Sequence, residues 1–294
     1  MLLTVNISPT SLAYTWPDPQ TAGIASAVEE ITDWEEDSSG NLHVVGYSED
    51  GEGHLEYIKY NKIASNGTWG SWITISGDYS DITDGSYPAD AELIEIELTS
   101  DNDPVVMYAM HAPGSRELRM IASSESSGGS SWDLVGADDG AEVIIDADDS
   151  VMINSAAFVI DQDDDTPHIF LSGYGINGPS VSGYFHVEQA TGTDVFDATF
   201  DNTDYDDTTD SAYIGEYMVE NSSFEEGGGS FYGVGIVNDG DPTYDVWSFT
   251  DAFGGWNSNN NVQQIQDDAV NSRAATIDVH LASAGKQVAI WTIE

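Results

Sequence analysis

The feature that most constrains this chain is an internal repeat that recurs roughly every sixty residues. Its clearest landmark is the start of an apolar run, found at Leu42, Pro104, Pro167, Ser230 and Gln287, with spacings of 62, 63, 63 and 57 residues. A second landmark is an alanine that opens an earlier run, at Ala27, Ala91, Ala156, Ala212 and Ala274. A third is an aromatic residue after a Gly/Ser/Thr turn, at Trp69, Trp132, Phe196 and Trp256. Three landmarks in one register indicate a repeated structural unit.

Within each repeat, short apolar or alternating runs are separated by Gly, Asn, Asp and Pro, a pattern typical of β-strands. The first repeat contains four such runs: AVEEITDW, NLHVVGYS, HLEYIKYN and SWITIS. Four antiparallel strands in a unit of this length match one blade of a β-propeller. The competing interpretation is a β-sandwich whose periodicity is accidental.

The sequence therefore predicts an all-β fold, a five-bladed β-propeller formed by a single domain over residues 1–294. The last repeat has only two strands, so we expect the N-terminal segment to supply the others and close the ring. Alanines at the innermost strands suit five strands that converge on a narrow axis. The expected blades are approximately 26–77, 90–136, 155–200, 211–266, and 273–294 together with 1–16.

Charge and composition exclude several classes of partner. The chain has 53 Asp and Glu against 6 Lys and Arg, a net charge of −47. It therefore offers no basic patch for nucleic acid or for an anionic membrane surface. The unpaired negative charges also repel one another across a compact surface. This repulsion is screened only at high salt, because the Debye length falls to about 3 Å at 1 M. The composition resembles that of proteins from halophilic archaea and their viruses.

The sequence also lacks the usual signs of membrane insertion and of disulfide or thiol chemistry. It contains no Cys, and so no disulfide framework or thiolate site. It contains no run approaching the ~20 apolar residues of a membrane-spanning helix. The N-terminal residues have neither the basic region nor the long apolar run of a secretory leader.

The turns before the aromatic landmarks resemble the sialidase-type neuraminidase repeat, whose Asp-box reads Ser-x-Asp-x-Gly-x-Thr-Trp. The corresponding segments are SNGTW at Ser65–Trp69, ESSGGSSW at Glu125–Trp132 and TDAFGGW at Thr250–Trp256. Only the last has an Asp, Asp251, at the Asp-box spacing. The resemblance implies a propeller. It implies little about activity, because these turns lie opposite the active site in that family.

Catalytic residues of related propellers are not matched well. The sialidase arginine triad would need three separate blades, but Arg116 and Arg119 fall in one blade and leave Arg273 alone. Arabinanase-like five-bladed glycosidases place three carboxylates at the channel mouth, and acid catalysis needs two carboxyls about 5–9.5 Å apart. The nearest alternative catalytic set here is Asp90, Asp210 and Arg273. The residues therefore favour binding over catalysis.

We expect ligand-binding residues in the loops that join second to third strands and one blade to the next. These residues are Trp16, Tyr47, Tyr79, Tyr87, His111, Arg116 and Tyr174. His43 and His168 occupy equivalent strand positions and are expected to pack inside. No organic cofactor is predicted. Clustered carboxylates at Asp161, Asp163 and Asp165 could bind Ca²⁺ or another hard cation, although they do not follow calcium-loop spacing.

Together these features predict a non-enzymatic virion surface protein of a haloarchaeal virus: a capsid decoration, spike or turret that contacts other virion proteins and binds host glycans. The alternative is a halophilic glycoside hydrolase of a five-bladed propeller family. An intracellular scaffold in the haloarchaeal cytoplasm is a third option. A homo-oligomer is compatible with the sequence.

Overall fold

A computed structural model describes the larger part of the repeat region. The described residues are 28–49, 55–76, 93–112, 115–124, 126–133, 142–148, 152–174, 182–188, 210–212, 218–226, 230–238, 244–252, 262–270, 277–282 and 286–291. In these ranges the chain forms antiparallel strands and turns, and no α-helix. None of the described segments forms a helix long and apolar enough to cross a membrane.

The first sheet has the four strands predicted from the first repeat, hydrogen-bonded in chain order. The turn between its first two strands is fixed by Asp37, whose carboxylate accepts hydrogen bonds from the backbone N–H groups of Ser39 and Asn41. Gly40 in this turn has a φ of 78°, which favours glycine. The strands are β1 (Glu30–Glu36), β2 (Leu42–Glu49), β3 (Leu55–Ile63) and β4 (Ile73–Thr74).

The second sheet has one strand more than the sequence predicts. After a very short fourth strand, a fifth strand returns and pairs with the third along its far end. This segment, EVIIDAD, has an apolar run but lies between the landmarks of the repeat. The strands are β5 (Glu95–Leu98), β6 (Pro104–Ala112), β7 (Ser115–Ser123), β8 (Trp132–Asp133) and β9 (Glu142–Asp148).

The third and fourth sheets differ from the prediction at their boundary. Ser211 and Ala212 were expected on the innermost strand of the fourth blade, but β13 (Asp210–Ala212) pairs with β12 (Ser182–Glu188) as the last strand of the third sheet. The remaining strands of the third sheet are β10 (Met152–Ile160) and β11 (Pro167–Tyr174). The fourth sheet contains β14 (Met218–Glu226), β15 (Ser230–Asn238), β16 (Tyr244–Ala252) and β17 (Val262–Val270).

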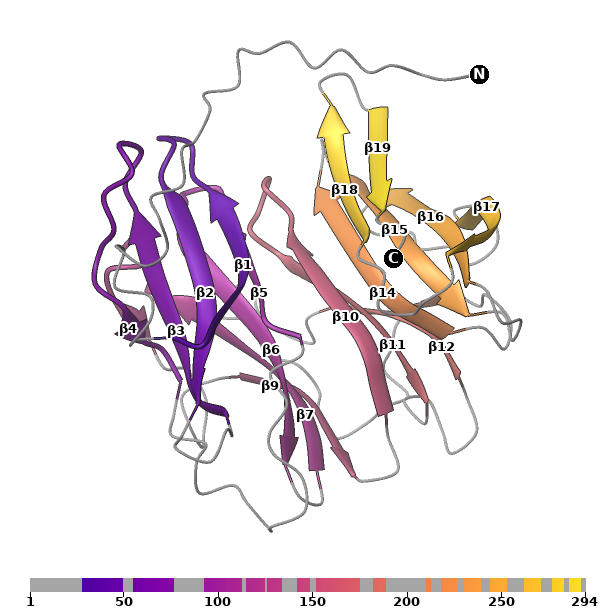
Figure 1. Cartoon of the computed structure of the whole chain (residues 1–294), viewed down its shortest axis with the longest axis horizontal. Coiled ribbons are helices and arrows are strands. Elements are labelled where there is room, and N and C mark those ends of the chain that lie inside the picture. Colours follow the sequence, from indigo (N-terminus) through magenta and orange to yellow (C-terminus); the bar gives the residue numbers. More distant parts are fainter. Residues whose placement is uncertain are drawn as a thin grey trace.

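The last sheet has two strands in the described residues, β18 (Ile277–Ala282) and β19 (Lys286–Trp291), as the sequence predicts. The first strands of successive sheets contact one another in the order β1, β5, β10, β14, β18. Those strands are therefore the inner strands of the arrangement. Figure 1 shows the sheets following each other in chain order, from the first at the left of the view to the last at the upper right.

The best-defined core lies between the first and second sheets. It joins Val45, Ile58 and Tyr60 of the first sheet to Ile96, Val106 and Tyr108 of the second. Trp132 packs against this cluster with its ring edge toward Tyr60, at 5.0 Å between ring centroids. Trp132, one of the aromatic landmarks of the repeat, therefore packs against the core between these two sheets.

Candidate functional site

The turns between first and second strands lie together on one end of the molecule, because they bond directly across neighbouring sheets. The backbone N–H of Ser38 donates to Asn102 Oδ1 of the next sheet over 2.9 Å. In the same way, the N–H of Ser100 donates to Asp165 Oδ1 of the following sheet over 2.7 Å. We call these two contacts the turn clasps. They define a clasped end of the molecule, and the hairpin ends between second and third strands lie at the opposite end.

Each clasp acceptor stands two residues before its second strand and has a left-handed backbone. The φ angles are 65° at Asn102 and 60° at Asp165. Asn and Asp tolerate this conformation better than other residues with a side chain. The clasp thus combines a turn requirement with an inter-sheet hydrogen bond.

Replacing Asn102 separates these two contributions. Asn102→Gly keeps the left-handed turn but loses the clasp, and we expect the free energy of unfolding to fall by about 1 kcal/mol. Asn102→Ala adds left-handed strain of about 1–2 kcal/mol and should be less stable still. Urea unfolding in molar salt measures both variants. A glycine variant as stable as the wild type would mean that the clasp contributes nothing.

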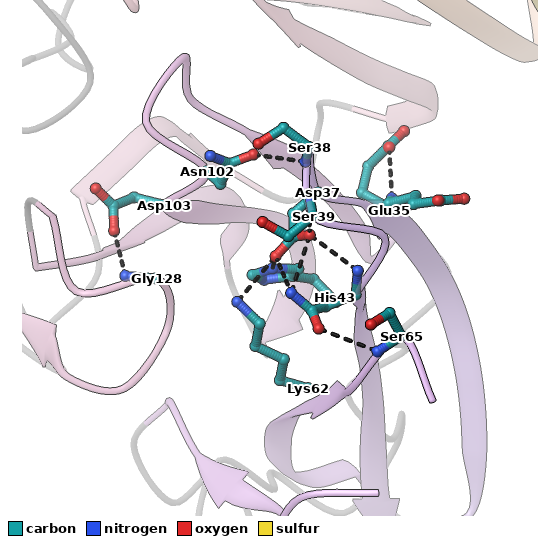
Figure 2. A network of polar contacts seen from close by, with 12 residues as sticks. Glu35, Asp37, Ser38, Ser39, His43, Lys62, Ser65, Asn102, Asp103 and Gly128 are labelled. Carbon is teal, nitrogen blue, oxygen red and sulfur yellow. Dashed lines mark hydrogen bonds and ion pairs between the residues drawn. The ribbon is translucent and has the colours of Figure 1, made fainter. Parts of the chain in front are cut away.

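A buried polar network lies just inside the clasped end (Figure 2). His43 Nε2 lies 3.3 Å from Asp37 Oδ2, and Lys62 Nζ lies 3.0 Å from the same oxygen. On the other side of the ring, His43 Nδ1 lies 2.9 Å from the Tyr60 hydroxyl. Because the Asp37 carboxylate can only accept, His43 carries its proton on Nε2 and accepts from Tyr60 at Nδ1.

The protonation states follow from burial and from these bonds. Burial and the Lys62 charge lower the pKa of His43 to about 4, against the raising effect of Asp37. Burial alone would raise the pKa of Asp37, but hydrogen bonds from Asn41, Lys62 and His43 hold it well below its usual value. Burial, with the nearby Asp37 and Asp103 carboxylates, raises the pKa of Tyr60. At neutral pH the network therefore contains a neutral His43, an ionised Asp37 and a neutral Tyr60.

This Asp–His–Tyr arrangement is enclosed and does not face a ligand. Tyr60 is 1% exposed and His43 is fully buried. The Tyr60 hydroxyl lies against the backbone of Gly129, so closely that no side chain fits between them. The network therefore joins two sheets instead of serving a substrate. His43 and His168 are both buried, which confirms that these two residues pack inside.

Carboxylates on the inner strands form a second repeated contact. Asp33 Oδ2 accepts from the backbone N–H of Ile96 in the next sheet over 2.9 Å. Glu95 Oε2 accepts from the backbone N–H of Phe158 in the following sheet over 3.3 Å. Inner strands have a free edge whose N–H groups need partners, and these side chains supply them. Burial and the Asp33 charge raise the pKa of Glu95 well above its usual value.

Four of the predicted ligand residues lie at equivalent ends of three neighbouring sheets. Tyr47 stands near the end of β2, and Tyr174 ends β11. His111 and Arg116 pair across the β6–β7 hairpin. All four are at the end of the molecule opposite the turn clasps. The other predicted ligand residues, Trp16, Tyr79 and Tyr87, lie outside the described residues.

Of the alternative catalytic set, the described residues include only Asp210. Asp210 lies on β13, the last strand of the third sheet, together with Ala212, which the repeat had placed on an innermost strand. The reason is that the Ser211–Ala212 run pairs with the strand before it in the chain. Asp90 and Arg273 lie outside the described residues.

Two of the three carboxylates expected to bind a cation, those of Asp161 and Asp165, accept hydrogen bonds from other groups. Asp161 Oδ1 accepts from the backbone N–H of Asp163. Both carboxylate oxygens of Asp165 accept from Ser100, through its backbone N–H and its hydroxyl. In the part of the chain that the structure describes, no group of three His, Cys, Asp or Glu side chains could hold a metal ion. The described residues therefore give no support to the predicted cation site at these three positions.

The sequence pattern did not predict the polar network or the inner-strand carboxylates. A usable signal existed for the second group, because Asp33 and Glu95 stand at the same distance before the second-strand landmark of their repeats. No comparable signal existed for Lys62, whose partner Asp37 lies in a turn, or for Tyr60, which contacts Gly129 in a turn of the next sheet.

Solved structures with a similar fold are enzymes that act on glycans. The polysaccharide lyase Uly1 matches with a TM-score of 0.52 at 13% identity, over 89% of this chain and 54% of its own. The Penicillium chrysogenum alpha-L-arabinanase in complex with arabinobiose matches with a TM-score of 0.50 at 10% identity, over 89% of this chain and 74% of the arabinanase chain. An exo-beta-1,3-galactanase from Phanerochaete chrysosporium matches with a TM-score of 0.50 at 8% identity, over 88% of this chain and 58% of the galactanase chain.

The chain spans about half the length of the lyase it matches. No family model matches the sequence, and no curated protein matches it. At identities this low the likeness shows the fold and nothing more. The sheets of this chain form a β-propeller, as the repeat and the sialidase resemblance predicted.

Proposed function

We propose that this chain is a non-catalytic, glycan-binding β-propeller of five blades. The observation that carries the proposal is the likeness of its fold, over 89% of its length, to enzymes whose ligands are polysaccharides. Five blades follow from the five repeats, with residues 1–16 completing the last sheet. A shared fold does not show that an activity is shared, so we propose glycan binding and not catalysis.

The binding face is proposed at the end opposite the turn clasps. Tyr47, His111, Arg116 and Tyr174 come from three neighbouring sheets and stand at equivalent hairpin ends there. An aromatic ring with a polar edge suits a sugar, which presents C–H faces surrounded by hydroxyls. Arg116 adds a cationic donor for acidic sugars in a chain with few cations.

The hydrolase alternative has one observation in its favour. Asp33 and Glu95 are neighbouring inner-strand carboxyls, and burial together with the Asp33 charge raises the pKa of Glu95, as is often the case for a general acid. Both carboxylates, however, accept hydrogen bonds from the next inner strand. Such bonds hold the side chains between sheets, which favours a structural role.

The place of action is proposed to be the surface of a haloarchaeal virion. The net charge of −47 suits molar salt, and a glycan-binding surface suits attachment to a host cell. Other virion proteins are then its partners, and a homo-oligomer is one arrangement. Detection of the chain in purified particles tests this location, and recovery from cytosol alone would contradict it.

Binding is tested on an oligosaccharide array of arabinan, β-1,3-galactan and acidic sugars in molar salt. We expect retention of at least one class without release of shortened products. Tyr174→Ala should weaken binding about tenfold, equivalent to 1.4 kcal/mol. The matched control is Tyr232→Ala, because Tyr232 stands at the other end of its sheet, beside the β14–β15 turn. Turnover would favour the hydrolase, and equal loss in both variants would contradict the proposed face.

A further inference from the structure

One exposed turn carries the acceptor sequence for N-linked glycosylation. The turn between β3 and β4 contains Asn66-Gly67-Thr68, which matches the Asn-x-Ser/Thr pattern in which x is not proline. The pattern is short, and Asn6 and Asn221 also match it. Accessibility decides which match can act, because the transferring enzyme must reach the asparagine amide.

The two matches within the described residues differ in accessibility. Asn66 and Thr68 are both exposed, and the space around Gly67 is open, since an added Cβ would have nothing within 4 Å. Asn221 instead lies inside the inner strand β14, where it pairs with Ile236 of β15. An enzyme could therefore reach Asn66 without disturbing a sheet, whereas Asn221 becomes available only if β14 separates from β15. Asn6 lies outside the described residues.

The turn presents both groups that the acceptor sequence needs. The Gly67 N–H donates to the Ala64 carbonyl over 2.7 Å, and the Ala64 N–H donates to the Thr68 carbonyl over 2.9 Å. Asn66 Oδ1 accepts from the Thr68 backbone N–H over 2.9 Å. These bonds use backbone groups and one side-chain oxygen. Asn66 Nδ2 and the Thr68 hydroxyl have no hydrogen-bond partner among the described residues, so both are available at the surface.

The same bonds protect the Asn66 amide. In an exposed Asn-Gly sequence, the glycine nitrogen can lose its proton, attack the asparagine Cγ and expel ammonia, and water then opens the ring to an acid. Here the Gly67 N–H is held by the Ala64 carbonyl, and the Asn66 side chain is held by Thr68. The attack requires both bonds to break. The turn therefore keeps Asn66 as the amide that glycosylation requires.

This turn lies at the clasped end of the molecule. The backbone N–H of Ser65 donates over 3.0 Å to Oδ1 of Asn41, which belongs to the β1–β2 turn. Figure 2 shows Ser65 beside the polar network at that end. The proposed glycan-binding face is at the opposite end, so a group attached to Asn66 would leave that face open.

We propose that Asn66 is an N-glycosylation site. In the transfer, Nδ2 loses a proton and bonds to the anomeric carbon of an oligosaccharide carried on a lipid phosphate. The bond from that carbon to the phosphate oxygen breaks, and the lipid phosphate leaves with the electron pair. The amide keeps Oδ1, so its hydrogen bond from Thr68 survives the modification. The site is independent of glycan binding by this chain and requires that this turn faces solvent in any assembly.

The test uses the full folded chain, purified in molar salt. It is incubated with a haloarchaeal oligosaccharyltransferase and the lipid-linked oligosaccharide of that enzyme. We expect the intact mass to rise by one oligosaccharide, and peptide mapping to place the sugar on Asn66. A synthetic peptide of residues 61–72 is the control for the enzyme. Transfer to the peptide without transfer to the folded chain, or transfer to neither, would overturn the proposal.

Four variants separate the acceptor from the turn. Asn66→Asp keeps the oxygen that accepts from Thr68 but has no amide nitrogen, and Thr68→Val keeps the backbone bonds but lacks the hydroxyl. Both should lose the mass shift completely, whereas Thr68→Ser should keep it. Ser223→Ala, which removes the Asn221 match, is the matched control and should also keep it.

The variants also have a clear contrary result. A mass shift that persists in Asn66→Asp and disappears in Ser223→Ala would overturn the proposal by placing the sugar on Asn221. Urea unfolding of each variant shows that its fold is intact. None of these measurements uses glycan binding, so a failure of the proposed function on the oligosaccharide array would leave them interpretable.

Discussion

Replacing Gly129 with alanine should lower the free energy of unfolding by about 2–5 kcal/mol, the sum of left-handed strain and local overpacking. Gly129 has a φ of 82°. An added Cβ would lie 2.6 Å from Tyr60 Cζ and closer still to the hydroxyl. Tyr60 cannot easily yield, because its hydroxyl bonds to His43 and its ring packs on Trp132.

Gly67 provides the matched control for this prediction. It has nearly the same φ, 81°, but an added Cβ would have nothing within 4 Å. Gly67→Ala should therefore cost only the strain of about 1–2 kcal/mol. Urea unfolding of the two variants in molar salt isolates the clash with Tyr60. Equal losses of stability would mean that Tyr60 moves freely and that the enclosed network is loose.

The protein should lose stability as the pH falls from about 6.5 to 4. His168 is 4% exposed, and burial lowers its pKa to about 4 from an ordinary 6.5. In this window the unfolded chain binds the proton and the folded chain does not, so stability falls as pH falls. The shift corresponds to about 3 kcal/mol for each such histidine. His43 adds a similar contribution, with its pKa also lowered to about 4.

Other groups change this pH profile in known directions. Because folding lowers the pKa of Asp37, its carboxylate stabilises the folded protein at pH values above the ordinary pKa of an aspartate. This stabilisation is lost as the pH falls further. Glu95 acts in the opposite sense, because its raised pKa favours the folded state as the pH falls. The histidine contribution is isolated by substitution at one site.

His168→Val removes one titrating group without introducing a polar one. Val105 stands at the same position of the second sheet, directly after the first residue of the second strand, so the fold already accommodates valine there. We expect the variant to lose about 3 kcal/mol less stability than the wild type between pH 6.5 and 4. Unfolding curves at fixed salt across this range measure the difference. Parallel profiles would show that folding does not lower the pKa of His168.

The repeat made most of the fold predictable, and one of its landmarks also explains the main error. The second-strand landmark kept a spacing of 63 residues from Pro167 to Ser230, whereas the alanine landmark shortened to 56 at Ala212. The short interval was the sign that Ala212 belongs to the preceding sheet. A short apolar run does not by itself show which of two neighbouring sheets it joins. Here the pairing of β13 with β12 places it in the third sheet.

The candidate site was less predictable than the fold, for a physical reason. Strand periodicity gives the face of a side chain but not its partner in another sheet. Asp37, His43 and Lys62 meet because a turn and two strands converge, and neither residue type nor spacing announced it. Asp161 and Asp165 were grouped by sequence proximity, yet the clasp directs the Asp165 carboxylate toward Ser100 of another sheet.

The turn clasps give the second sheet an acceptor for one neighbour, Asn102, and a donor for the other, Ser100. The donor is a backbone N–H, which nearly every residue supplies, and the acceptor is one side chain in a turn. A duplicated repeat would therefore carry a complete donor on one side and a complete acceptor on the other. Repeats could be gained or lost in evolution, or transplanted by design, without new residues in the flanking units. Gly228 and Gly285, which lie outside the described residues, stand at the acceptor position of the later repeats. Substituting asparagine at those two glycines would be the natural way to extend the clasp around the chain.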